Sequence, residues 1–402
     1  MRQLLLTIIL LVGTLAYTQQ SIAQSLPNRQ KVQKAYQLVQ AEKAEANAAS
    51  HIIKVVYFHG NDQEPLAKWQ ERLPRTLEAV SIFYQEEFQK HGIVIEGIPF
   101  EKENGEYVIH RVQGDQSAHN YEPTSGVTIE REIANKTQGK INPSRDYILV
   151  INGLCYQKED GTYVFHAPYH GRGSFQSGVC HVADCELLDA LLLTDTTQRM
   201  QYSEMAVALK ECSVAEFNSW YVGGIAHELG HLFGLPHDFG HPQEIDANTI
   251  SLMGQYGSRH FKDYLWGGTP TSRFSTAGIM QLMGHPLFTQ IAKVRKTDFQ
   301  FPKLTFNKNE AGVVLKASLN TSYKPYAIIT LISHTRPGAD YFAQSASEVI
   351  ETESFSVELG QIPSGTYNLE LIYAFPNGET HRIKDILIVE EDNASTSATI
   401  HN

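Results

Sequence analysis

Residues 226–238 read Ala-His-Glu-Leu-Gly-His-Leu-Phe-Gly-Leu-Pro-His-Asp, and this stretch decides the fold of the chain. His227 and His231 are four residues apart, so on a helix they lie on one face and can bind one metal ion from the same side. Glu228 follows the first histidine, where its carboxylate can take a proton from a water beside that metal. The stretch therefore predicts a helix that carries two metal ligands and a general base.

The second half of the stretch supplies a third ligand. Gly234 lies three residues after His231, where a helix can end on a residue with positive φ. Pro236 stiffens the returning chain, which brings His237 within reach of the metal. Three neutral histidines leave one position open for water, which is the pattern of a catalytic rather than a structural zinc site. A buried helix with hydrogen-bonded histidines is the alternative, but it has no reason to place a glycine and a third histidine at these offsets.

A methionine turn, Ser251-Leu252-Met253-Gly254, follows about one loop length later. Together with the histidine motif it resembles the metzincin superfamily of zinc endopeptidases, which carry a Met beneath the metal. The resemblance implies one catalytic Zn2+ ion held by the three histidines, with Glu228 as the general base and peptides or proteins as substrates. It also implies that Met253 packs under the histidines as an apolar floor without binding zinc.

The residues that flank the motif indicate which branch of the metzincin superfamily the chain resembles. Asp238, directly after the third histidine, is similar to the reprolysin-like and snapalysin-like branches, and we expect it to lie behind the ligands without binding the metal. Astacin-like and serralysin-like enzymes carry a zinc-binding Tyr two residues after the Met. Here Gln255 occupies that position and Tyr256 comes one place later, so no tyrosine ligand is assigned.

The N-terminus predicts an exported protein. Residues 1–23 combine Arg2, a short apolar run and the small residues Ser21 and Ala23, which predicts a signal peptide cut after Ala23. The apolar run is shorter than the ~20 residues of a membrane span, so we expect no membrane association after cleavage and a secreted, extracellular or periplasmic location. Residues 24–50 are polar and read as a mobile or loosely helical lead-in or a short propeptide.

Length and composition predict two folded domains. The chain has 402 residues, 42% of them hydrophobic, and a formal net charge of −11 without a basic stripe, so no nucleic-acid partner is expected. Residues 51–296 read as the peptidase domain. The metzincin resemblance implies an α/β (α+β) fold for it, with a twisted mixed sheet and long helices. The pattern predicts strands at 52–58, 93–100, 107–112 and 147–151 and helices at 66–90, 128–136, 217–233 and 272–283.

Residues 171–181 are the best candidate for the edge strand that lines a metzincin cleft and pairs with extended substrate. His166, His170, His181 and Asp184 surround this stretch, loosely like the structural metal loop of matrixins. Surface histidines in a polar loop are the favoured interpretation, so no second metal is predicted there. The sequence leaves open whether a structural Ca2+ ion binds elsewhere.

The chain has four cysteines: Cys155, Cys180, Cys185 and Cys212. An even number in an exported protein predicts disulfides. Four cysteines allow three pairings, and their spacing does not choose among them. None of them precedes residue 155, so an inhibitory propeptide cysteine is absent.

Residues 302–392 change character and predict an all-β sandwich. Short alternating strands are separated by Pro and Gly turns, and Pro363 to Tyr367 is similar to the tyrosine corner of immunoglobulin-like and fibronectin type III-like domains. Such a module binds a glycan or a protein, or supports the catalytic domain. Residues 393–402 read as a frayed tail.

Two other classes of function remain open at this point. One is a non-catalytic adhesin or binding protein on a protease scaffold, although the intact Glu228 argues against it. The other is a zinc hydrolase of a non-peptide or glycan-linked amide. If instead the C-terminal sandwich of an active protease acts as the adhesin, deletion of residues 302–402 would leave cleavage unchanged but abolish target binding.

Overall fold

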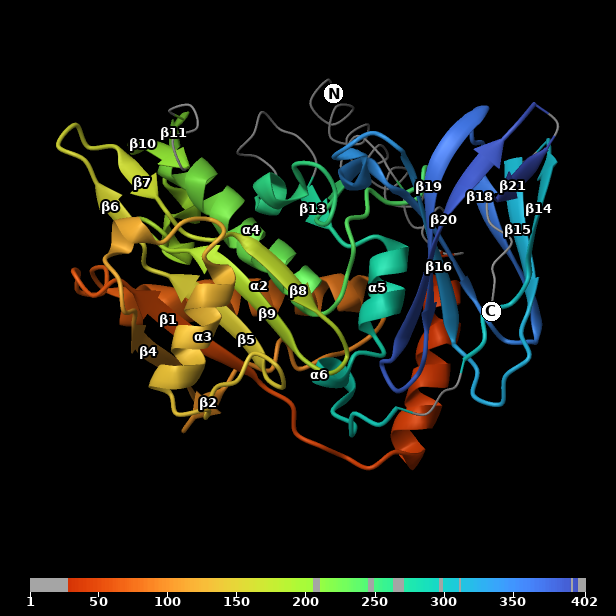
Figure 1. Ribbon diagram of the computed structural model, residues 1–402, viewed down its shortest axis with the longest axis horizontal. Coiled ribbons are helices and arrows are strands. Elements are labelled where there is room, and N and C mark those ends of the chain that lie inside the picture. Colours follow the sequence, from red (N-terminus) through yellow and green to blue (C-terminus); the bar gives the residue numbers. More distant parts are fainter. Residues whose placement is uncertain are drawn as a thin grey trace, which may run out of the picture.

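The computed structural model describes residues 28–204, 210–244, 249–262, 271–295, 299–310, 312–391 and 393–396. The N-terminal two thirds form a mixed α/β region, and the C-terminal part consists of strands that lie at one end of the molecule (Figure 1). The predicted signal peptide at 1–23 lies outside the described residues. Within them, no helix has the length and apolar character needed to cross a membrane.

A five-stranded sheet, in the order β4-β1-β5-β9-β8, organises the N-terminal region. Four of its strands are parallel, and β8 pairs antiparallel with β9 at one edge. Every residue of β5 is buried, as its uninterrupted apolar sequence predicts for a central strand. The strands span β1 (Ile53–His59), β4 (Ile109–Gln113), β5 (Tyr147–Asn152), β8 (His170–Gly173) and β9 (Gly178–Ala183).

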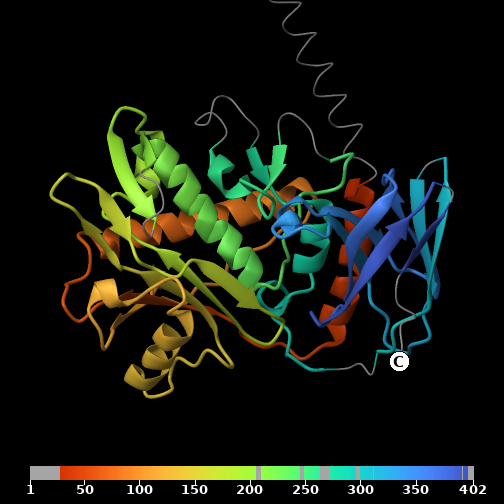
Figure 2. The ribbon, with the colours of Figure 1, turned by 45° about the horizontal axis from the view of Figure 1, so that its top comes forward.

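Helices cover both faces of this sheet. The long helices α2 (Trp69–Lys90) and α4 (Val214–Leu232) lie on one face and α3 (Gly126–Lys136) lies on the other (Figure 2). Leu73, Leu77 and Val80 of α2 are fully buried because their spacing of three to four residues places them on one side of the helix. This layer positions α4, which carries the histidine motif, directly against β8 and β9.

Smaller elements complete the N-terminal region. The expected strand at 93–100 is absent; Ile93 and Ile98 are buried without strand pairing, and Phe100 forms an isolated bridge to Ile53. Asn104 and Gly105 both have positive φ and join a short hairpin. The remaining elements are β2 (Lys102–Glu103), β3 (Glu106–Tyr107), β6 (Cys155–Gln157), β7 (Tyr163–Phe165), β10 (Arg199–Glu204), β11 (Lys210–Ser213), β12 (Thr249–Ser251), β13 (Thr271–Arg273), α5 (Thr276–Leu282) and α6 (Pro286–Thr289).

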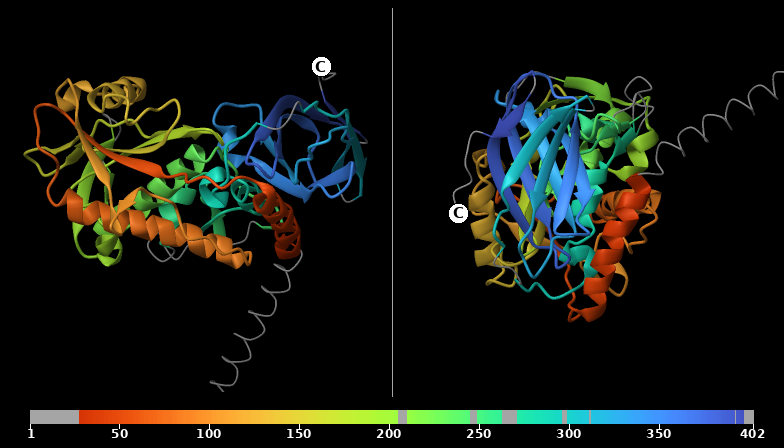
Figure 3. Two further views of the ribbon diagram at one scale, coloured as in Figure 1. Left: turned by 90° about the horizontal axis from the view of Figure 1, so that it is seen from below. Right: turned by 90° about the vertical axis from the view of Figure 1, so that its right-hand side faces the viewer.

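The polar lead-in differs from the loose segment that its composition predicts. Residues 28–45 form a helix, drawn in red in Figure 3, that lies beside the C-terminal strands. Val32, Ala35 and Val39 are fully buried because they share one face at helical spacing, and this face joins the main hydrophobic core. Lys31 adds a hydrogen bond from its Nζ to the carbonyl of Ser347 at 2.8 Å. The helix is therefore a structural element that connects the two regions.

The C-terminal strands form two antiparallel sheets, here called the C-terminal sheet pair (residues 304–396). Their orders are β14-β15-β18 and β17-β16-β19-β20-β21, and a second hydrophobic core includes side chains of both. The hydroxyl of Tyr367 donates to the carbonyl of Pro363 at 2.9 Å, the bond that a tyrosine corner requires. The strands span β14 (Leu304–Asn309), β15 (Gly312–Ser318), β16 (Ala327–His334), β17 (Gln344–Val349), β18 (Ser354–Gly360), β19 (Gly365–Ala374), β20 (Thr380–Val389) and β21 (Ala394–Thr396). Strand β21 lies in the segment predicted to fray, and its Ala394 is buried.

The larger C-terminal sheet is buried on both faces, which the predicted two-domain division does not anticipate. In β16, Ile328 belongs to the core between the two sheets, whereas Ala327 and Ile329 belong to the core of the N-terminal region. Tyr326 lies in that N-terminal core as well, and its hydroxyl donates to the carbonyl of Met280. The two regions therefore share a continuous apolar contact rather than a flexible linker alone.

The predicted disulfides are not formed. All four cysteines are free and buried. Burial raises the pKa of the Cys180 thiol, and the charge of Glu228 raises it further. Burial also raises the pKa of the Cys185 thiol, and there the charge that raises it further is that of Asp184. The two thiols that are nearest in sequence thus lie in different surroundings, and their burial favours the inert thiol form.

Candidate metal centre

Helix α4 begins and ends with local signals. Ser213 caps its start: the Ser213 hydroxyl accepts from the Glu216 amide at 3.1 Å, and the Glu216 carboxylate accepts from the Ser213 amide at 2.7 Å. At its end the Leu235 amide donates to the carbonyl of Gly230 at 2.9 Å, and Gly234 has φ of 85°. This closing bond and the positive φ form the turn that Gly234 predicts. The turn sends the chain back toward the helix.

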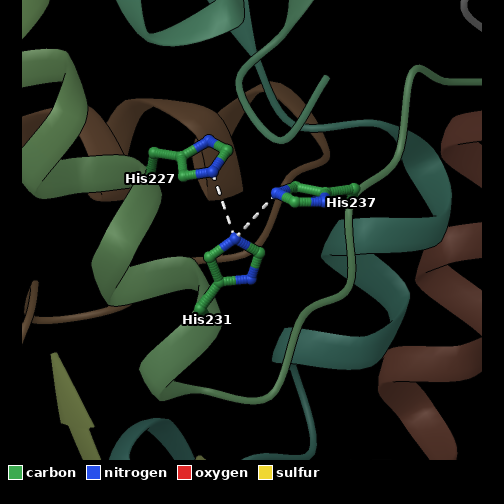
Figure 4. Close-up of side chains that lie close together, drawn as sticks. All are labelled: His227, His231 and His237. Atoms are coloured by element: carbon green, nitrogen blue, oxygen red, sulfur yellow. Dashed lines mark hydrogen bonds between the residues drawn. The ribbon is translucent and has the colours of Figure 1, made fainter. Parts of the chain in front are cut away.

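The three motif histidines converge. His227 and His231 extend from α4 and His237 from the segment that follows it (Figure 4). The Nε2 atom of His231 lies 3.1 Å from that of His227 and 3.2 Å from that of His237. Among the described residues this is the one group of three or more potential metal-binding side chains whose ligand atoms all lie within 4.8 Å of one another.

Each histidine uses its other ring nitrogen to bond an acceptor. Nδ1 of His227 donates to the carbonyl of Leu252 at 2.7 Å, and Nδ1 of His231 donates to the carbonyl of Leu235 at 2.8 Å. Carbonyl oxygens only accept, so the proton of each neutral ring is on Nδ1 and the lone pair is on Nε2. Two imidazoles that face each other with lone pairs cannot hydrogen-bond to each other.

The residues therefore fit a metal ion. Burial, and next the charge of a neighbouring histidine, lower the pKa of His227 to about 3; burial lowers that of His231 to about 4. Both rings are neutral at physiological pH, which is the form that binds metal. A cation at the point where the Nε2 atoms converge would satisfy lone pairs that otherwise repel each other. Three nitrogen ligands with an open fourth position suit zinc.

Glu228, the residue next to His227 on α4, has an unused carboxylate oxygen. Its side chain is 7% exposed, and Oε2 has no hydrogen-bond partner among the described residues. Burial raises the pKa of Glu228 to about 8, and a hydrogen bond from the Gly171 amide opposes that rise. A carboxyl with a raised pKa can both accept and return a proton near neutral pH.

Met253 packs against α4. A side chain at Gly230 would place its Cβ 2.6 Å from the Met253 sulfur, so the sulfur contacts the helix next to His231. The preceding residue, Leu252, supplies the carbonyl that orients His227. The methionine turn thus lies against the histidine helix through two neighbouring residues.

The edge strand of the sheet lies directly over α4. A Cβ at Gly171 in β8 would come within 2.3 Å of the Glu228 carbonyl oxygen, so only glycine allows this approach. Only 171–173 of the predicted stretch 171–181 lies at the edge, in β8, because β9 is interior to the sheet. The outer edge of β8 is the strand edge of this sheet next to the candidate metal centre.

The histidines near this strand do not form a surface cluster. His181 is fully buried, and its Nε2 lies 3.2 Å from Glu130 Oε1. Asp184 is also fully buried, but it pairs with both terminal nitrogens of Arg72 at 2.9 and 3.1 Å. The interpretation of His181 as a surface histidine is therefore wrong, because His181 is buried against Glu130.

The residues that follow the motif connect α4 to the rest of the chain. The carboxylate of Asp238 is buried, accepts from the Gly240 amide at 2.8 Å and from the Ser275 hydroxyl, and thereby anchors the segment that carries His237. Tyr256 is 54% exposed, and its ring packs against the guanidinium of Arg259.

Two residues of the C-terminal sheet pair contact His237, and no pattern in the sequence predicted either contact. Asp340 Oδ2 lies 2.6 Å from His237 Nδ1, across 103 positions of sequence. The Tyr341 ring stacks on the His237 ring, with centroids 3.7 Å apart and planes inclined by 28°. Both belong to the short helix η5 (Ala339–Phe342), which lies between β16 and β17.

A cavity of about 800 Å³ adjoins the same histidines. One wall is the end of the histidine motif, and the other is the C-terminal sheet, which contributes acidic, basic and amide residues to the lining. The lining includes His231, Pro236, His237, Ser333, Asn368, Glu370, Arg382 and Lys384. Within it, Arg382 pairs with Glu370 at 3.2 Å.

Comparison with known proteins gives a structural match only. No protein-family model matches the chain, and no curated protein matches it in sequence. Wild-type OgpA from Akkermansia muciniphila has a similar structure with a TM-score of 0.66 and 18% sequence identity, over 87% of this chain and 97% of OgpA. Catalytically inactive OgpA in complex with an O-glycopeptide substrate, glycodrosocin, gives 0.63 and 18%, over 88% and 97%. The chain therefore shares the mixed α/β fold of OgpA.

Proposed function

We propose that the chain is a zinc-dependent endopeptidase that cleaves peptides carrying an O-linked glycan. The observation that carries this proposal is the convergence of the three Nε2 atoms, together with the unpaired Oε2 of Glu228, the residue next to His227. The metzincin-like motif supports peptide hydrolysis. The structural similarity to OgpA, one structure of which holds an O-glycopeptide substrate, supports the glycopeptide class.

The chain's own residues have defined tasks in this proposal. His227, His231 and His237 would hold the ion, which supplies a Lewis acid and lowers the pKa of a water molecule. Glu228 Oε2 takes a proton from the attacking water and returns it to the leaving amine. The Gly171 amide holds the Glu228 carboxylate in place. Met253 packs beneath the helix, and Gly234 turns the chain so that His237 returns.

Substrate binding uses two surfaces beside the metal centre. The free edge of β8 can pair with an extended peptide backbone, which is independent of peptide sequence. The cavity that adjoins His231 and His237 presents Asn368, Glu370 and Arg382, whose polar groups can bond sugar hydroxyls. A substrate with both a peptide and a glycan would engage both surfaces.

Digestion of glycodrosocin and of the same peptide without its glycan tests the proposal. The full chain is compared with Glu228→Gln, with Glu103→Gln as a matched change at an exposed position, and with a chelated sample. We expect peptide-bond cleavage of the glycosylated peptide, retained by Glu103→Gln and lost in the other two samples. Mass spectrometry identifies which bond is broken.

Each other outcome rejects a defined part of the proposal. Equal cleavage of both peptides would remove the glycan requirement. Release of the glycan with an intact peptide would indicate a hydrolase of the glycan linkage. Binding of glycodrosocin without cleavage, by protein that holds zinc, would indicate a binding protein on a protease scaffold.

A further inference from the structure

The third histidine is oriented differently from the other two. Backbone carbonyls accept from His227 and His231, whereas a side chain of the C-terminal sheet pair, Asp340, accepts from His237. A carboxylate on the outer nitrogen of a metal-bound histidine fixes its tautomer and raises the basicity of the ligand nitrogen. In this chain that carboxylate comes from a region that contains none of the three ligands.

The segment that carries His237 is also bonded to this region through its backbone. The Phe239 amide donates to the carbonyl of Ala343 at 2.8 Å, and the Ser345 amide donates to the carbonyl of Gly240 at 3.2 Å. These bonds flank Gln344, the first residue of β17, which forms an isolated parallel bridge with Gly240. They align the return of the chain after α4 with the start of β17.

Further contacts flank the ring itself. Tyr341 covers one face of His237, and the Tyr341 carbonyl accepts from the Gln255 amide at 3.0 Å, so η5 lies between the third ligand and the methionine turn. The guanidinium of Arg382 in β20 donates to the carbonyl of Gly234, at the turn after α4. The C-terminal sheet pair thus contacts the returning segment at the turn, at the ligand and beyond it.

We propose that the C-terminal sheet pair is part of the metal centre, with Asp340 as the positioning residue of the third ligand, His237. This inference rests on the proposed metal site and assigns a role that the histidine motif does not contain. It makes metal binding dependent on the docking of the C-terminal sheets: the helix ligands are fixed within the N-terminal region, and the third ligand is fixed across the interface.

An ordinary surface hydrogen bond is the competing explanation. The side chain of Asp340 is 57% exposed, and exposed pairs of this kind commonly contribute little to stability. The two explanations differ in what they predict for the metal. A surface contact leaves zinc affinity unchanged, whereas a positioning residue lowers it when its charge is removed.

Zinc affinity of the full chain tests the proposal. Wild type, Asp340→Asn and Glu310→Gln, an exposed acid in the same sheet pair, are titrated with Zn2+ in competition with a chromophoric chelator. We expect Asp340→Asn to bind zinc about 10–100-fold more weakly and Glu310→Gln to bind as wild type does. Replacement of zinc by Co2+ gives a second readout, because a change in the orientation of His237 alters the visible absorption of the cobalt protein.

Melting of the metal-free proteins separates positioning from folding. We expect Asp340→Asn and wild type to melt at the same temperature without metal, because the side chain is exposed and the substitution is isosteric. Unchanged zinc affinity, or a loss of affinity together with a lower melting temperature of the metal-free variant, would overturn the proposal. Failure of wild type itself to bind zinc would instead reject the proposed function.

Discussion

The two ends of the histidine motif are held by different parts of the molecule. His227 and His231 belong to one helix and bond the carbonyls of Leu252 and Leu235 in the N-terminal region. His237 bonds Asp340 and stacks on Tyr341, both in the C-terminal sheet pair. The first end depends on backbone bonds that persist in most side-chain variants. The second end depends on a tertiary interface, so single substitutions can separate the two.

The largest effect is expected at the helix end. Glu228→Gln should lower kcat by about 10²–10⁴-fold, because glutamine cannot accept the proton of the attacking water. Zinc stoichiometry should stay at the wild-type value, because Glu228 is not a ligand. Steady-state kinetics with metal analysis of the same samples measures both. A loss of zinc together with activity would show that Glu228 holds the metal centre together, and the assignment as a base would fail.

The contact between β8 and α4 gives the next largest effect. Gly171→Ala should lower the free energy of unfolding by about 1–3 kcal/mol and also impair turnover, because the new methyl group meets the backbone oxygen of Glu228. Gly230→Ala is the matched comparison, since its methyl group meets the flexible end of Met253 and it gains helix propensity. Denaturant unfolding measures both variants. Equal stability of the two would contradict the close approach of β8 to the helix.

The next prediction concerns the helix at residues 28–45, which packs where the two regions meet. Val39→Ala should cost about 2–3 kcal/mol of unfolding free energy, because it removes two buried methyl groups and leaves a cavity. Leu38→Ala, on the exposed side of the same helix, should cost less than about 0.5 kcal/mol. Equal losses in chemical denaturation would show that residues 28–45 are not packed as a core helix.

The smallest effect concerns pH and the buried His285, which is not one of the three candidate metal-binding histidines. Burial lowers the pKa of His285 to about 3, so its neutral form is favoured in the folded state. This contribution to stability is complete above the ordinary value of 6.5 and is lost as pH falls toward 3. Between pH 7 and pH 5 the unfolding free energy of wild type should therefore fall by about 2 kcal/mol more than that of His285→Asn.

Urea unfolding at the two pH values measures this difference. Both proteins retain His227 and His231. The difference between wild type and His285→Asn in the loss of unfolding free energy from pH 7 to pH 5 therefore reports on His285. Parallel pH profiles would show that His285 is not held neutral by its surroundings.

The shared core also changes how the C-terminal region should be studied. Deletion of residues 302–402 was a natural test for a separate binding module. In the structure this deletion removes Ala327 and Ile329 from the N-terminal core and Asp340 from His237. We therefore expect it to destabilise the remaining chain as well as to weaken metal binding. Point variants at the interface are the informative alternative.

Local patterns predicted the histidine helix and its turn because their causes are local. The four-residue spacing of His227 and His231 and the positive φ of Gly234 depend on neighbouring residues. The uninterrupted apolar run 147–151 likewise predicted a central strand, which is β5. The disulfides and the surface placement of His181 were predicted wrongly, because pairing and burial depend on residues distant in sequence.

The order of histidines, glutamate and glycine by itself determined the helix, its end and the set of candidate ligands, since these follow from helical periodicity and backbone preferences. Only the tertiary structure decided that Asp340 and Tyr341 lie on His237, that Gly171 lies on Glu228, and that residues 28–45 belong to the core. Contacts between segments a hundred residues apart arise from the packing of whole sheets and helices, and no local spacing encodes them.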